Sequence, residues 1–184
     1  MDSAFIHQAA NELVQNAGTR TIKQIARSCS LDISETSRIK DMLGLLSLYF
    51  DKPLILINHQ LDKQTKQMVC GYALGHYLEH RLLMDLHTLN KFLTIKDRHI
   101  RLYEHNAFTS HLMLDSDEVY QMTKRGLDAA QISAAKRIHL NLVLVKLLEL
   151  HHLGYDLQHY HAQHHAFIKQ FNLPAHFQFD VAAG

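Results

Sequence analysis

Two histidines and a glutamate lie within five consecutive residues of this sequence, at His76, Glu79 and His80. On a helix the two histidines share one face, one turn apart, and imidazole is a common ligand of zinc. The glutamate directly before the second histidine is placed to accept a proton from a zinc-bound water. Glu104, on a following predicted helix, could supply a third ligand. The spacing therefore suggests a zinc site that activates water.

The abundance of histidine weakens this interpretation. The chain holds 16 histidines, so a five-residue match arises easily. A lone histidine beside an apolar helix face is more often a hydrogen-bonded core residue than a ligand, and we favour that interpretation for His76. His105 and His111 are six residues apart and do not share a helix face, so we interpret them as polar surface. The main prediction is therefore no metal, with zinc as the alternative.

The C-terminal segment is rich in histidine and aromatic residues. His161 and His165 have the i,i+4 spacing that can bind nickel, copper or zinc, but no cysteine and few acids accompany them. We expect incidental metal binding there, on a solvated or dimer-facing helix. Two parts are predicted, a domain over residues 1–156 and an extension over residues 157–184, whose phenylalanines would suit a homodimer contact.

The composition is that of one globular domain. Hydrophobic residues make up 47% of the chain, charged residues 20%, and the net charge is +1, so no overall charge points to nucleic acid. Two cysteines can form neither a Cys-only metal site nor a disulfide scaffold. The first residues lack the features of a signal peptide, and no run approaches a membrane span. We expect a cytoplasmic protein with no membrane partner.

Helical periodicity dominates the sequence. A turn signal at Asp51–Pro53 separates two short apolar runs and predicts a hairpin over residues 45–58. Ser34 is predicted to begin a helix, and a brief strand could follow near Phe92. The fold class is therefore α+β, mainly α. The other predicted helices cover residues 4–17, a short segment from Thr21, residues 63–93, 102–114, 117–125 and 128–153.

Two segments have the pattern of a helix–turn–helix. In residues 21–43, Ser34–Lys40 would be the reading helix, and residues 126–155 give a second such pattern. The two basic residues of the first reading helix are offset by two acidic residues beside them, so phosphate contacts would be few. A DNA-binding regulator is one alternative, with nucleic acid an unfavoured partner.

Five segments, taken in order, resemble the ImmA/IrrE family of zinc metallopeptidases, which is associated with phages and mobile elements. The segment "KQMVCGYALGHYLEH" resembles the family's active helix, whose motif is HELGH, and "NAFTSHLML" resembles its Asn-x-Phe-Ala helix. The resemblance covers about residues 20–156 and implies a zincin-like fold, with a small sheet beside the active helix. The other three segments are "IKQIARSCSLDI", "YFDKPLILINHQL" and the closing helical segment that ends in "LELHHLGY".

The chain departs from this family at the residues that carry the chemistry. Where the family has HELGH, this sequence reads "YALGH", so Tyr72 replaces the first histidine ligand and Ala73 replaces the general base. His76 alone is kept, and Leu102 stands at the position of the third, acidic ligand. The resemblance therefore implies a vestigial motif at Tyr72, Ala73 and His76, and no catalytic residue. Glu79 would be catalytic only if the shifted site of His76, His80 and Glu104 were active.

The main hypothesis is a non-catalytic metallopeptidase relative that regulates a protein partner. Members of the family commonly cleave or release a helix–turn–helix repressor, so the resemblance implies a repressor or a host factor as partner. Edge pairing of an extended partner segment would use Leu54, Ile55, Leu56, Ile57 and Asn58. The alternatives are a zinc peptidase with the shifted site and the DNA-binding regulator. No cofactor is expected in the main hypothesis.

Overall fold

The computed structural model describes residues 2–40, 42–50, 52–82, 91–93 and 100–157. The described helices are α1 (Ser3–Ala17), α2 (Ile22–Ser28), α3 (Lys63–Leu82), α4 (Ile100–Met113), α5 (Ser116–Lys124), α6 (Ala129–Lys136) and α7 (Leu140–His152). The described strands are β1 (Asp32–Thr36), β2 (Gly44–Tyr49), β3 (Lys52–Asn58) and β4 (Lys91–Leu93). The predicted α+β class, mainly α, is confirmed. The extension predicted over residues 157–184 lies outside the described residues, apart from Leu157.

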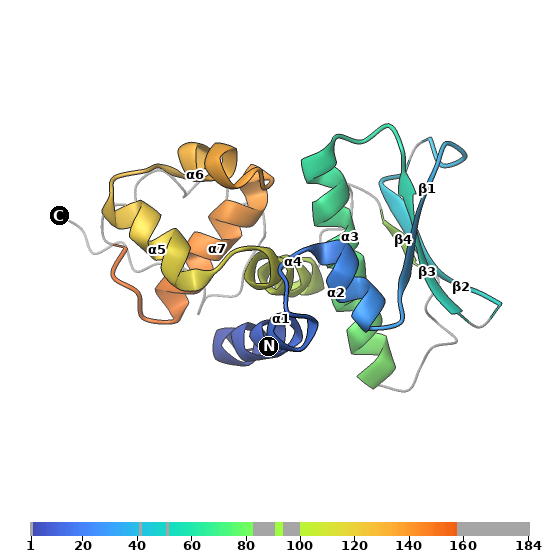
Figure 1. The fold of residues 1–184 in the computed structure, drawn as a ribbon, viewed down its shortest axis with the longest axis horizontal. Helices are drawn as coiled ribbons and strands as arrows, with labels where there is room; N and C mark the ends of the chain where they lie inside the picture. Colours follow the sequence, from blue (N-terminus) through green and yellow to red (C-terminus); the bar gives the residue numbers. More distant parts are fainter. Residues whose placement is uncertain (1, 41, 51, 83–90, 94–99, 158–184) are drawn as a thin grey trace.

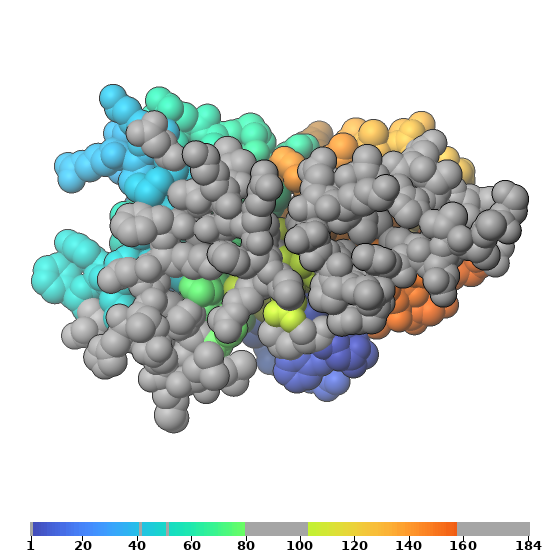
Figure 2. Space-filling model, turned by 180° about the vertical axis from the view of Figure 1, so that it is seen from behind, coloured from blue at the N-terminus to red at the C-terminus, as the bar shows by residue number. Residues whose placement is uncertain are grey.

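The elements form a sheet at one end, a helical group at the other, and a central helical layer between them (Figure 1). Helix α3 packs against β2 and β3 on one side and against α4 on the other, and α4 also contacts α1 and α7. Figure 2 shows the same order from behind, with the strands and α5–α7 at opposite ends and α1 at the lower edge of the middle. The contact of α3 with α4 is therefore central to the molecule.

The sheet has the order β1-β3-β2-β4. Strands β2 and β3 form the predicted antiparallel hairpin, with Leu48 opposite Pro53. In β3 the side chains of Ile55 and Ile57 are fully buried, as the alternation of a strand with one face on the core requires. Strand β4 covers Lys91–Leu93, at the brief strand expected near Phe92, and pairs with β2. The helix predicted over residues 63–93 is therefore wrong at its C-terminal end.

The helix predicted to begin at Ser34 is wrong. Residues 32–36 form β1, which pairs in parallel with β3, so that Ile33 lies opposite Ile55. Leu31 and Ile33 alternate with polar residues, a period of two that suits a strand, and pairing with β3 stabilises that conformation. The first helix–turn–helix pattern therefore has no reading helix.

The single helix predicted over residues 128–153 is also wrong, because the chain breaks into α6 and α7. Arg137 has a φ of 53° and ends α6, and His139 caps α7 by accepting a hydrogen bond from the Asn141 amide. The two helices resemble a helix–turn–helix in outline. However, α7 is largely buried, including its lysine, Lys146, at 1% exposure. Helix α7 therefore offers no basic face for DNA.

None of the helices that the structure describes combines the length and the apolar character of a membrane span.

Candidate functional site

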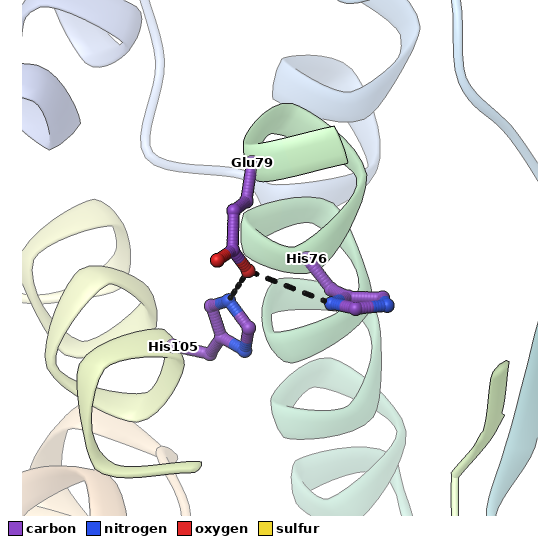
Figure 3. Close-up of side chains that lie close together, drawn as sticks. All are labelled: His76, Glu79 and His105. Atoms are coloured by element: carbon purple, nitrogen blue, oxygen red, sulfur yellow. Dashed lines mark hydrogen bonds and ion pairs between the residues drawn. The ribbon is translucent and has the colours of Figure 1, made fainter. Parts of the chain in front are cut away.

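Three side chains of metal-ligating type lie close together between α3 and α4. His76 and Glu79 extend from α3, and His105 extends from α4 toward them (Figure 3). One nitrogen or oxygen atom of each side chain lies within 4.8 Å of those of the other two. The position of the cluster follows from the 3.6-residue period, because residues three apart on α3 point to the same side.

The glutamate carboxylate lies between the two imidazole rings. Its Oε2 is 3.2 Å from Nε2 of His105 and 3.8 Å from Nδ1 of His76. His76 is 5% exposed and His105 3%, whereas the Glu79 side chain is 19% exposed. The ring of Tyr72 packs edge-on against His105, with centroids 5.0 Å apart. Packing therefore restricts both imidazoles, and the carboxylate can still reach solvent.

Two glycines on α3 allow α4 to come this close. A Cβ at Gly71 would lie 2.2 Å from the Thr109 side chain, so that side chain or the helix that carries it would have to shift. A Cβ at Gly75 would lie 3.2 Å from Phe108 and 3.3 Å from His105. The pair is four residues apart, on one helix face, and it brings the backbone of α4 within reach of the α3 side chains.

A pocket lies beside the cluster, between α1, α3 and α4. Its volume is about 460 Å³, and Glu79 and His105 form part of its wall. Two further carboxylates, Glu12 and Glu104, lie in the same wall. The rest of the lining is mostly apolar: Phe5, Ile6, Ala9, Leu13, Asn16, Gly75, Leu78 and Phe108. The pocket thus combines an apolar surface with three carboxylates.

Comparison with known families gives one match to this sequence. The IrrE N-terminal-like domain, a peptidase family, matches residues 33–148. This range covers more than half of the chain and includes α3, α4 and the cluster between them. The chain belongs to this family. No curated protein and no solved structure matches it significantly.

The zinc that the IrrE-like family implies does not fit the described residues at the motif positions. Protein zinc ligands are thiolates, imidazoles and carboxylates. Tyr72 offers a phenol, 8% exposed, and Ala73 offers a fully buried methyl group. The side chain of Leu102 lies outside the described residues. Among the described side chains at the motif positions, only that of His76 is a metal-ligand type.

The shifted site predicted from the sequence is only partly assembled. His76 and Glu79 are in the cluster, but Glu104 lines the pocket and is not among the three converging ligand atoms. The side chain of His80 lies outside the described residues. The sequence predicts Glu79 as a base. In the structure its carboxylate lies between the two imidazoles, where it would be a metal ligand.

His105 is the residue that sequence reasoning missed. Its interpretation as polar surface is wrong, and so is that of His111, which is fully buried. A signal was available, because Gly71 and Gly75 are spaced for close contact with a neighbouring helix. Nothing in the sequence showed which residue of α4 would face them.

The strand chosen for partner binding is not an edge strand. Each of Leu54–Asn58 in β3 pairs with β1, and Leu54–Ile57 also pair with β2. Edge pairing needs a strand with one free side, so β3 cannot add a partner strand in this fold. Ile57 and Asn58 are moreover buried, at 0% and 5% exposure.

A second cluster of ionisable groups lies deeper, between α4 and α7. The ammonium of Lys146 donates to Nδ1 of His111 at 2.7 Å and to Oγ of Ser116 at 2.8 Å. The opposite nitrogen of His111, Nε2, lies 3.2 Å from Oε2 of Glu149. Lys146 therefore fixes the His111 proton on Nε2, which donates to the carboxylate.

Burial and charge shift the titration of this buried cluster. Burial lowers the pKa of His111 to about 4, against the raising effect of its hydrogen bond to Glu149. Burial also lowers the pKa of Lys146 to about 7, with a contribution from the charge of Arg20. Burial alone would raise the pKa of Glu149, but hydrogen bonds from His111 and other donors hold it below the ordinary range. These groups are buried and join α4 to α7 through hydrogen bonds.

Proposed function

We propose that this chain is a non-catalytic member of the IrrE-like family that regulates a protein partner by binding it. The observation that carries the proposal is the replacement at the zinc motif, with Tyr72 packed against His105 and Ala73 fully buried. Without a ligand at the first position and a base at the second, water at the family's zinc position is neither bound nor deprotonated. The resemblance supports a repressor or host factor as the partner, in a phage or mobile-element context.

The proposal places the chain in the cytoplasm. Both cysteines, Cys29 and Cys70, are buried free thiols. Burial raises the pKa of Cys70 to about 12, so its reactive thiolate is absent at neutral pH. Such thiols need no oxidising compartment.

The pocket between α1, α3 and α4 is the binding site that we assign to the partner. Its apolar wall suits an aliphatic or aromatic side chain, and Phe5, at 56% exposure, extends that wall to the surface. Glu12, Glu79 and Glu104 concentrate negative charge in a chain whose net charge is only +1. Charge complementarity therefore favours a partner segment with Lys or Arg beside a large apolar residue.

Hydrolysis by the shifted motif is less well supported. That mechanism needs Glu79 as a base beside zinc held by His76 and His80. The carboxylate instead contacts both His76 and His105, so a metal placed there would take Glu79 as a ligand. A glutamate that ligates the ion is a weaker base, because the positive charge of the metal stabilises the ionised carboxylate.

Selection from a random peptide display library on the immobilised full chain tests the proposed binding site. Enriched peptides should combine Lys or Arg with an aliphatic or aromatic residue. Their affinity should fall about fivefold when Glu12→Gln and Glu104→Gln are combined, because two ion pairs at the pocket wall are lost. Asp32→Asn, at an exposed carboxylate on β1, is the matched control and should leave the affinity unchanged.

Two outcomes would overturn the assignment of the pocket. One is enrichment of peptides without basic residues, or of none at all. The other is an affinity that stays the same in the double variant.

A further inference from the structure

We infer that His76, Glu79 and His105 form a binding site for a divalent transition metal, displaced from the family's zinc motif. The site keeps His76 and takes its other two ligands from residues that the motif does not use. The family's motif takes its two histidine ligands from positions 72 and 76 of α3. The proposed site uses residues 76 and 79 instead, and therefore lies about one turn further along this helix. It does not depend on the proposed binding function.

The distances are close to those of a bound ion. Two ligand atoms at about 2.0–2.1 Å from a tetrahedral zinc are roughly 3.3 Å apart. The Glu79 oxygen lies 3.2 Å from His105 Nε2, which already satisfies that spacing. It lies 3.8 Å from His76 Nδ1, and the three ligand atoms together lie within 4.8 Å of one another, so rotation of the exposed end of Glu79 and of the His76 ring would have to bring His76 closer to the other two ligands.

The ligand chemistry is that of zinc and its neighbours in the transition series. Two neutral imidazoles and one carboxylate form the ligand set of many open zinc sites, and the same set binds Co²⁺ and Ni²⁺. In the absence of metal, the Glu79 carboxylate interacts with His105 at 3.2 Å. A metal ion would compete with protons for the imidazole nitrogens. The affinity for the metal should therefore fall as the pH falls and the imidazoles become protonated.

The surroundings restrict the ligands before an ion arrives. His105 is held by the ring of Tyr72 and by the close approach of α3 at Gly75. Both imidazoles are buried, which reduces the side-chain entropy that metal binding would cost. Glu79 and His105 also line the pocket, so the fourth coordination position opens toward it. The metal would join α3 to α4 at the centre of the fold.

Titration of the full chain with Co²⁺ alone tests the site. A tetrahedral site with nitrogen and oxygen ligands gives Co²⁺ a characteristic visible absorption, and Zn²⁺ should abolish it by displacement. We expect one Co²⁺ per chain at this site, and loss of the absorption in Glu79→Gln and in His105→Gln. His59→Gln, at an exposed histidine outside the cluster, should leave the absorption unchanged.

The histidine-rich extension needs its own control. In His161→Ala combined with His165→Ala, the absorption should persist, because those residues are not part of the cluster. Glu79→Gln preserves size and hydrogen bonding at a partly exposed side chain, so it keeps the test valid if His105→Gln fails to fold. Retention of the absorption in a folded Glu79→Gln protein would overturn the inference. Its loss in the extension variant, or its absence in the wild type, would do the same.

Discussion

Tyr72 and His105 form an edge-on ring pair, with centroids 5.0 Å apart. Tyr72 stands at the position where the resemblance to the family implies a zinc ligand. The pair joins α3 to α4 through packing, and Ala73 beside it leaves no space for a charged side chain. The position that the resemblance implies for the first zinc ligand is therefore part of a packed interface between two helices.

Ala73→Glu should destabilise the protein severely. Ala73 is fully buried in the core that includes Val69 and Leu74, so the new carboxylate would lose its hydration and overpack the core. We expect the free energy of unfolding to fall by roughly 3–5 kcal/mol. Urea unfolding measures the loss. Ala130→Glu, at an exposed position on α6, should change stability by less than about 0.5 kcal/mol; similar losses in both variants would refute the packed interface.

The two glycines of α3 should differ in their tolerance of a methyl group. At Gly71 the methyl would clash with Thr109, and we expect Gly71→Ala to cost about 1–3 kcal/mol of stability. At Gly75 the contacts are tight but not impossible, and the higher helix propensity of alanine contributes about 1 kcal/mol in the opposite direction. Gly75→Ala should therefore be close to neutral. Thermal unfolding of both variants distinguishes them, and equal melting temperatures would contradict the close approach of α4.

The buried His111 predicts a specific pH dependence of stability. Its pKa is lowered to about 4 in the folded protein, so between pH 6.5 and 4 the unfolded chain takes up a proton that the folded protein does not. Stability should therefore fall as the pH falls, by roughly 1–2 kcal/mol between about pH 6.5 and pH 5. Urea unfolding at both pH values measures this change.

Comparison with a variant isolates this histidine among the 16 in the chain. His111→Gln keeps an acceptor for Lys146 and a donor for Glu149, and should remove that part of the pH dependence. His59→Gln, at an exposed histidine, should leave it intact. If the slopes of stability against pH are the same in His111→Gln and the wild type, His111 is not responsible.

Sequence reasoning succeeded where one periodicity dominated a segment. The hairpin of β2 and β3 followed from two apolar runs around Pro53, and α1 and α4 followed from the 3.6-residue period. Residues 32–36 were misassigned because a five-residue edge strand gives too short an alternation to distinguish from a helix start. The break at Arg137 was missed because a non-glycine residue with positive φ leaves little sign in the sequence.

The site was only half predictable for a related reason. His76 and Glu79 share one helix, so their proximity follows from spacing alone. His105 joins them through the packing of α4 on Gly71 and Gly75, a tertiary contact for which the sequence gives no register. For the same reason β3 was taken as a free edge, although β1 covers it through a parallel pairing.

The metal site and the pocket should be coupled if both proposals hold. Glu79 belongs to the wall of the pocket and to the ligand set, so a bound Zn²⁺ would offset negative charge at the partner site. We expect Zn²⁺ to weaken the binding of a selected basic peptide by about twofold to fivefold, and the peptide to weaken Zn²⁺ equally. Isothermal titration with and without Zn²⁺ measures both effects. Unchanged peptide affinity at saturating Zn²⁺ would separate the two sites.

Hydrolysis of peptides by the full chain in the presence of Zn²⁺ tests the central claim most directly. A complex peptide mixture, incubated with the wild type or with His76→Ala and compared by mass spectrometry, reveals any new cleavage product. The replacement of the motif ligand and base by Tyr72 and Ala73 predicts no product above the level of the variant. Cleavage that requires Zn²⁺ and disappears in His76→Ala would contradict the account and show that this fold retains a working peptidase centre.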